Sequence, residues 1–229
     1  MTFLKGIQDY HSSVDGEHHR YRSWEHCYNY FQRSRPSRFT GERDLAALHL
    51  AFYLASWGMY RGSSFLLQHA YTVHHDTIDL IADMRFDALW NVDFGANESD
   101  GQLLPLALEL VENIKNVYKP FARKISPNSA QPTDTLITKI ILGTFGCLPA
   151  CDRYFIDGFK YSKFKFTCVN KQFIHRLLEI CRENLIELKK EQAMIEQSSG
   201  IRYPLMKLVD MGFWQVGDDL EQGRIQRGS

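Results

Sequence analysis

The chain lacks a surplus of charge of either sign, because 27 lysines and arginines are balanced by 27 aspartates and glutamates. A balanced protein exerts no general attraction on nucleic acid or on an anionic membrane, so any such affinity has to come from a local patch. Cysteine is also scarce: the five cysteines are odd in number and lie mostly within apolar segments. This usage argues against a disulfide-stapled secreted domain and favours a reducing, intracellular compartment.

Long hydrophobic runs are missing, and so is the basic start that opens a signal peptide. The most apolar window, residues 45–57, contains His49 and is followed by Gly58. A bilayer span needs about 20 apolar residues, so this window is too short and too interrupted. We therefore expect a cytoplasmic protein without membrane association.

No repeat, heptad run or low-complexity tract divides the 229 residues, a length that can bury a full core. Apolar residues recur at spacings of three and four, which predicts an all-α fold of seven or eight helices. We expect a single domain over residues 1–216 and a flexible tail over residues 217–229. The expected helices cover about 20–33, 44–57, a segment opening at 76 or 77, 102–120, one carrying 136–142, 153–159, 170–190 and 203–214.

Three local expectations follow from composition. Residues 44–57 are apolar on nearly all sides, which predicts a helix at the centre of the molecule. Residues 163–169 alternate aromatic and polar side chains and alone have strand character. Thr133 or Asp134, and likewise Asn170, are expected N-caps, since their side-chain oxygens can accept from the exposed amides of a first turn.

Residues 136–159 form the most informative stretch of the sequence. An apolar helix runs through a glycine turn into Pro149-Ala150-Cys151-Asp152-Arg153. Asp152 stands at the mouth of a second apolar segment, where a carboxylate is poorly solvated and suited to chemistry. The alternatives are that Asp152 caps the helix over 153–159 or forms a structural ion pair with Arg153 or Lys139. Capping and catalysis do not exclude each other.

The steps Phe145-Gly146, Pro149-Ala150 and Asp152 resemble the helix-hairpin-helix DNA glycosylases, in particular the adenine glycosylase branch. The resemblance covers about residues 138–155. It implies that Asp152 is the carboxylate that stabilises a cationic sugar or activates water, and that Lys139 is a candidate Schiff-base amine. The family's phosphate-gripping hairpin and iron–sulfur cysteines have no counterpart here, and we expect no cofactor.

Lysines alternate with aromatic residues directly after this stretch. Lys160, Lys163 and Lys165 form the strongest local basic patch and suit a nucleic-acid backbone, with a charged edge strand as the alternative. Between Trp57 and Ser64, two glycines four apart could leave amides free for a phosphate, with Arg61 as the anchoring cation. The alternative there is tight helix packing at the two glycines.

Two further patterns bring together residue types that can act in metal binding or catalysis. The group His69, His74, His75, Asp76 and Asp79 is dense in metal-ligand side chains but matches no strong metal signature, so we expect an exposed polar face and no metal. Arg20 and His26 match the arginine and histidine spacing of the HEPN ribonucleases, in which the histidine would deprotonate a ribose hydroxyl.

Taken together, these patterns predict a nucleic-acid-interacting protein, and within that class a DNA glycosylase-like enzyme. Its catalytic residues would be Asp152 and Lys139, with DNA or RNA as partner. A flipped base would enter between helix 44–57 and Asp152, against Trp57 or Phe145 as a stacking wall. A non-enzymatic helical module with a protein partner is the alternative, and a HEPN-like ribonuclease is the third candidate.

Overall fold

The computed structural model describes residues 3–15, 19–96, 100–125 and 131–226. These ranges contain α-helices and short 3-10 helices but no β-strand, which confirms the all-α prediction. The α-helices are α1 (Phe3–Ser12), α2 (Arg22–Ser34), α3 (Arg43–Ser56), α4 (His75–Ile81), α5 (Asp100–Ile125), α6 (Asp134–Thr144), α7 (Arg153–Tyr161), α8 (Lys171–Glu183), α9 (Leu185–Ser199) and α10 (Leu205–Glu221). The 3-10 helices are η1 (Ser13–Asp15), η2 (Phe65–Gln68), η3 (Tyr71–His74) and η4 (Met84–Leu89).

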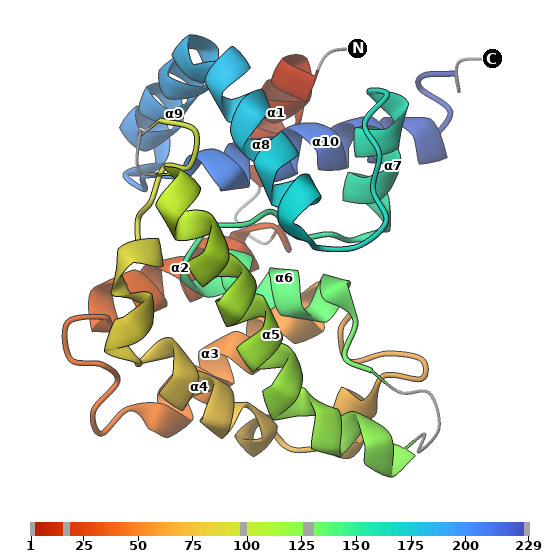
Figure 1. Cartoon of the computed structure of the whole chain (residues 1–229). Helices are drawn as coiled ribbons and strands as arrows, with labels where there is room; N and C mark the ends of the chain where they lie inside the picture. The colour runs from red at the N-terminus through yellow and green to blue at the C-terminus, as the bar shows by residue number, and fades with distance from the viewer. Residues whose placement is uncertain (1–2, 16–18, 97–99, 126–130, 227–229) are drawn as a thin grey trace.

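The helices fall into two groups (Figure 1). One contains α1 together with α7, α8, α9 and α10, and the other contains α2 to α6. Because α1 packs on α10, both ends of the described chain belong to the same group. The chain therefore crosses between the groups twice, after α1 and after α6.

α10 is the buried axis of the first group, since every residue from Leu205 to Gly217 is buried. α7 and α10 approach so closely that a Cβ on Gly217 would lie 1.9 Å from the Tyr154 carbonyl oxygen. Only glycine permits this backbone approach. The contact fixes the N-terminal end of α7, and with it the residue that precedes α7, against α10.

α3 departs from its predicted central burial. Its outer face exposes Leu45, Leu48 and Phe52, whose accessible fractions are 44%, 45% and 66%. The helix packs against α2, α4 and α6, and none of them covers this side. The periodicity of the sequence could not predict the exposed face of α3, because the pattern of apolar residues is the same whether or not another helix covers them.

Several helix ends also differ from the prediction. Pro120 does not end α5, which continues to Ile125 while Tyr118 and Ala122 stay buried and hold the last turns in place. Residues 170–190 do not form one helix, because the Asn184 side chain donates to the Ile180 carbonyl and closes α8 before α9 begins. The predicted domain boundary at residue 216 falls inside α10.

Residues 163–169 form no strand. The described part of the chain offers them no strand partner, and Lys163 adopts a positive φ of 68°. The Phe164 ring packs against Phe159, and the Phe166 ring packs against Phe173. The alternation of aromatic and polar residues thus reflects a loop anchored by its rings.

Candidate functional site

The segment that carries Asp152 is clamped from two sides. From α6, the Thr135 hydroxyl donates to the Cys151 carbonyl, and the Thr138 hydroxyl accepts from the Cys151 amide, both at 2.8 Å. From α10, an Asp210 carboxylate oxygen accepts from the Ala150 amide at 2.9 Å. These bonds satisfy a buried, non-helical backbone and set the place where α7 begins.

Asp152 both caps α7 and forms an ion pair. Its Oδ1 accepts from the Phe155 amide at 3.1 Å, and its Oδ2 accepts from Lys139 Nζ at 2.9 Å. The predicted N-cap and the predicted pair with Lys139 are therefore both confirmed. The Lys139 side chain is 3% exposed and that of Asp152 is 15% exposed, so the carboxylate is the member of the pair that reaches solvent.

A cavity of about 450 Å³ opens beside this pair, at the junction of the two helix groups. Lys139, Asp152 and Arg61 all line it. The loop after α3 supplies Arg61, α6 supplies Lys139 and the start of α7 supplies Asp152. The sequence linked Asp152 with Lys139 and singled out Arg61 separately, and all three share one cavity.

The cavity wall is rich in aromatic rings that the sequence did not assign together. Trp57 and Trp214 meet edge to face at 6.2 Å, and Tyr154 packs on Trp214 with centroids 5.0 Å apart. The Arg20 guanidinium lies 5.4 Å from the centre of the Trp57 ring. No acceptor among the described residues serves the buried Trp214 Nε1.

The charge of the cavity lining is strongly positive. Four cationic side chains and a single carboxylate face it: Arg20, Arg61, Lys139, Arg153 and Asp152. Arg153 is already paired with Glu221 at 2.9 Å, and Lys139 with Asp152. Arg20 and Arg61 form no ion pair with any described residue, which leaves two cations for an anionic ligand.

A second buried ion pair lies beneath the first, and sequence reasoning missed it. Lys207 Nζ and Asp210 Oδ2 are 2.9 Å apart, with side chains only 3% and 5% exposed. Burial raises the pKa of the Asp210 carboxyl, and the negative charge of Asp152 raises it further, while the Lys207 ammonium opposes the rise. The missed signal was Lys207 and Asp210 three apart in an otherwise apolar helix.

Lys207 is also enclosed by rings. Its Nζ lies 4.9 Å from the Trp24 ring centre and 5.0 Å from that of Tyr10. Both ion pairs border one small hollow of about 10 Å³, together with Trp57 and Trp214. The two pairs and the aromatic wall thus form one continuous cluster under the larger cavity.

The lysine patch lies away from this cavity. Lys160, Lys163 and Lys165 are exposed, and none of them forms an ion pair with a described residue. Lys160 is in the last turn of α7, about 12 Å along the helix from Asp152 at 1.5 Å per residue. Phe145, the second expected stacking residue, is wholly buried against Trp90. Of the two expected stacking residues, only Trp57 lines the cavity.

The two glycines around Arg61 do not pack a helix, so the alternative of tight helix packing is wrong. The three atoms nearest to a Cβ on Gly58 would all belong to the Arg61 side chain, and a Cβ on Gly62 would meet nothing within 4 Å. Both have positive φ, 75° and 59°, which explains the choice of glycine. The loop is a backbone turn that presents Arg61.

The histidine and aspartate group does not converge on a metal site. His75 lies 2.7 Å from Asp44, while Asp76 and Asp79 pair with Arg43. The prediction of an exposed polar face is wrong for His74, which is wholly buried between the hydroxyls of Tyr60 and Tyr118. In the described ranges no group of three or more potential ligand side chains is arranged for a metal ion.

The two residues of the HEPN-like pattern are separated. Arg20 lines the cavity against Trp57, whereas His26 is an exposed residue of α2 and does not line it. The pair therefore shares no pocket in which both could act on one phosphate.

Comparison of the chain with protein-family models, with curated proteins and with solved structures finds no significant match. Within the described ranges, no helix has both the length and the apolar character that a membrane crossing requires.

Proposed function

We propose that this protein binds nucleic acid and takes one unpaired nucleotide into the 450 Å³ cavity, where Asp152 acts on the bond between base and sugar. The observation that carries the proposal is the convergence of Lys139, Asp152 and Arg61 on this cavity. Its volume lies within the range of about 300 to 1,000 Å³ that is usual for small-molecule sites.

The charges and rings favour a nucleotide over other ligands of that size. Arg20 and Arg61 have no carboxylate partner among the described residues, so each can bind a phosphate oxygen. Trp57 is partly exposed at the cavity, so a base can stack against its ring, and the buried Trp214 supports it from behind.

Asp152 is suited to the chemistry by its position and its bonds. Each carboxylate oxygen accepts one hydrogen bond from the protein and keeps a lone pair for a water molecule or a sugar. In the proposed hydrolysis, the bond between C1′ and the base nitrogen breaks and its electron pair leaves with the base. Asp152 stabilises the positive charge on the sugar, and water then supplies the hydroxyl to C1′ and the proton to the base.

Lys139 acts here chiefly through Asp152. Its ammonium donates to the carboxylate and lies 4.8 Å from the Trp57 ring centre, so it orients both the acid and the stacking wall. To serve as a Schiff-base amine, Lys139 would first have to give up a proton and its bond to Asp152. The geometry therefore favours hydrolysis by water over a covalent lysine intermediate.

The lysine patch extends the site along α7. Lys160, Lys163 and Lys165 are exposed at the far end of the helix that Asp152 begins, where they can meet the phosphates that flank the bound nucleotide. Because the whole chain is neutral, this patch and the two arginines have to supply the electrostatic attraction.

The test is base release from nucleic acid by the wild type and by Asp152→Asn. Oligonucleotides carrying normal, mismatched and damaged bases are incubated with each protein, and free base is measured by mass spectrometry. Asn is as good an N-cap as Asp, so the start of α7 is retained. We expect release by the wild type, a loss of at least 100-fold in the variant, and unchanged affinity for the oligonucleotide.

Two controls secure this experiment. Asp157→Asn, on the same helix but outside the cavity lining, should keep full activity. Lys139→Met combined with Asp152→Asn removes both charges and should fold even if the single variant is unstable. Binding without base release by the wild type on every substrate would remove the catalytic part of the proposal.

A second candidate function is a protein-interaction module. It is favoured by the exposed stripe of Leu45, Leu48 and Phe52, which lie on one face of α3 at spacings of three and four. The same experiment separates the two candidates. If the protein neither binds nucleic acid nor releases base, the interaction module is the candidate function that remains.

A further inference from the structure

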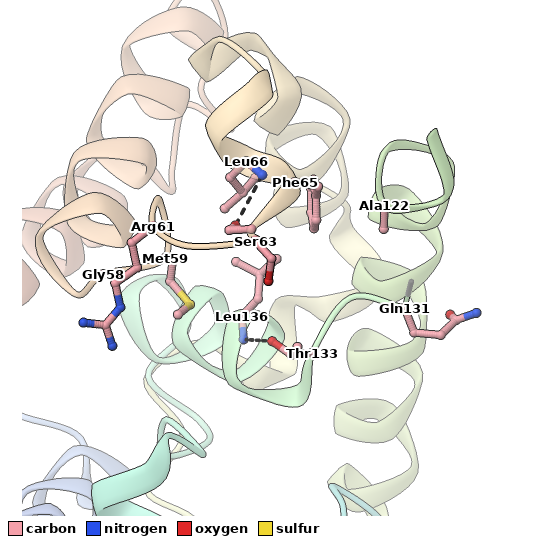
Figure 2. A pocket seen from close by; sticks show the side chains of 11 residues that line it. Gly58, Met59, Arg61, Ser63, Phe65, Leu66, Ala122, Gln131, Thr133 and Leu136 are labelled. Atoms are coloured by element: carbon pink, nitrogen blue, oxygen red, sulfur yellow. Dashed lines mark hydrogen bonds between the residues drawn. The ribbon is translucent and has the colours of Figure 1, made fainter. Parts of the chain in front are cut away.

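A second cavity of about 390 Å³ adjoins the first (Figure 2). The two cavities share Gly58, Met59 and Arg61, so the loop after α3 forms the border between them. The new cavity continues from this border toward Ala122 of α5 and Gln131, which precedes α6.

The lining of the second cavity differs from that of the first. Its walls are mostly apolar, and its rim carries uncharged polar groups. Apart from Arg61 it contains no charged side chain. The apolar wall comes from Met59, Phe65, Leu66, Ala122 and Leu136. Such a site suits a flat, uncharged group with hydrogen-bonding edges.

Polar groups at the rim of the second cavity can form hydrogen bonds with such a ligand. The hydroxyls of Ser64 and Thr133 accept from the Leu66 and Leu136 amides, bonds drawn as dashed lines in Figure 2. Neither hydroxyl donates to a described residue, so both protons are free for an acceptor on a ligand. Gln131 lines the opposite side of the opening, and Figure 2 shows its side-chain amide directed away from Thr133 and Leu136.

Arg61 lies where the two cavities meet. Figure 2 shows its guanidinium extending past Gly58 to the side away from Gln131 and Ala122. It forms no ion pair with a described carboxylate. In a nucleic-acid strand, one phosphate joins each pair of consecutive nucleosides, so a cation between two base-sized cavities matches the phosphodiester between two bases.

We propose that the second cavity is a subsite for the nucleotide adjacent to the one held beside Asp152, with Arg61 on the phosphate between them. This inference rests on the proposed function. It specifies the substrate as a nucleic acid with two consecutive unpaired nucleotides, either single-stranded or locally opened, in place of a single base flipped from an intact duplex.

The test compares mononucleotide and dinucleotide binding by titration calorimetry. The probes are thymidine 5′-monophosphate and the 5′-phosphorylated thymidine dinucleotide, with the adenine, guanine and cytosine counterparts and the ribose forms in parallel. For at least one base we expect the dinucleotide to bind at least tenfold more tightly.

A variant that fills only the second cavity decides where this gain arises. Ser63 is exposed at the second cavity and does not line the first. Ser63→Trp should abolish the dinucleotide gain and leave mononucleotide affinity unchanged. Ser63→Glu, a smaller change that places negative charge at the same point, should do the same. Ser198→Trp, at an exposed position on α9, is the matched control and should keep the gain.

The outcomes separate this inference from the proposal on which it rests. Mononucleotide binding with no dinucleotide gain would overturn the second subsite and keep the first. A gain that survives both Ser63 variants would place the second nucleotide elsewhere and also overturn the inference. Absence of binding by any probe would overturn both proposals.

Discussion

At the scale of single residues, the structural role of Asp152 and its proposed catalytic role coincide. The hydrogen bond that makes it a helix cap fixes one oxygen, and the Lys139 ammonium fixes the other. A carboxylate held at both oxygens has little freedom to turn, which is the requirement for electrostatic stabilisation of a developing charge. The cap is thus part of the proposed site, since it supplies the orientation.

The energetic coupling of Lys139 and Asp152 can be measured by a double-mutant cycle. Asp152→Asn leaves a buried ammonium without its counter-ion, and we expect a loss of about 3 kcal/mol in the free energy of unfolding. Lys139→Met should cost less, because Asp152 keeps the Phe155 amide and some contact with solvent. Combining both changes should restore most of the stability.

Chemical denaturation of the four proteins provides the measurement. If the losses of the two single variants simply add in the double variant, the pair is not coupled, and the view of Lys139 as the residue that orients Asp152 fails.

At the scale of elements, the site depends on how α7 is held against α10. The two helices touch through backbone at Gly158 and Gly217, where a Cβ on either would lie 1.9 Å from a carbonyl oxygen of the other helix. On the opposite side, Thr135 and Thr138 of α6 hold the segment that leads into α7. The position of Asp152 is therefore set by three helices.

Gly217→Ala tests this helix contact. The added methyl group would collide with the Tyr154 backbone, so the helices must separate, and we expect a loss of about 1–3 kcal/mol in the free energy of unfolding, or more. Gly101→Ala is the matched control, because nothing lies within 4 Å of the new methyl group and alanine favours a helix. Equal stabilities of the two variants in thermal denaturation would contradict the close contact.

At the scale of the whole molecule, charge is balanced, and the proposed chemistry is confined to one cavity. The 27 basic and 27 acidic residues cancel, while Arg20 and Arg61 at the cavity, and Lys160, Lys163 and Lys165 at and beyond the end of α7, form no ion pair with a described residue. A second whole-molecule property is the free energy of unfolding at acidic pH. It falls where a group that is buried in its neutral form would be protonated in the unfolded chain. His74 is such a group, with Nε2 2.7 Å from the Tyr60 hydroxyl and Nδ1 2.6 Å from the Tyr118 hydroxyl.

Burial lowers the pKa of His74 from 6.5 to about 3, with a smaller contribution from His75. Between these values the unfolded chain binds a proton that the folded chain does not. His74 therefore does not oppose folding above pH 6.5, and stability falls as the pH drops from 6.5 toward 3, by at most about 1.4 kcal/mol per pH unit.

His74→Gln should remove this part of the pH dependence. We expect urea denaturation between pH 7 and pH 4 to show a shallower loss of stability in the variant than in the wild type. His69→Gln, which removes a histidine outside the buried network, should retain the wild-type slope. Parallel slopes for wild type and His74→Gln would contradict the role of His74.

The sequence by itself determined the all-α class, the caps at Asp152 and Asn170, and a cap at Thr133 or Asp134, of which the structure shows Thr133. It also gave Lys139 as one of two candidate partners of Asp152. These features depend on residues close together in the chain, where helical periodicity and side-chain to backbone bonds act directly. The same local rules misjudged Pro120 and residues 163–169, because packing by distant residues decided both.

Only the tertiary structure decided which residues share a cavity. It brought Arg20, Arg61 and Trp214 to Asp152, buried Lys207 and Asp210 beneath them, and left one face of α3 uncovered. No periodicity encodes these relations, because they depend on how helices far apart in the chain cross. Those crossings are set by close backbone contacts such as that of Gly217 with Tyr154.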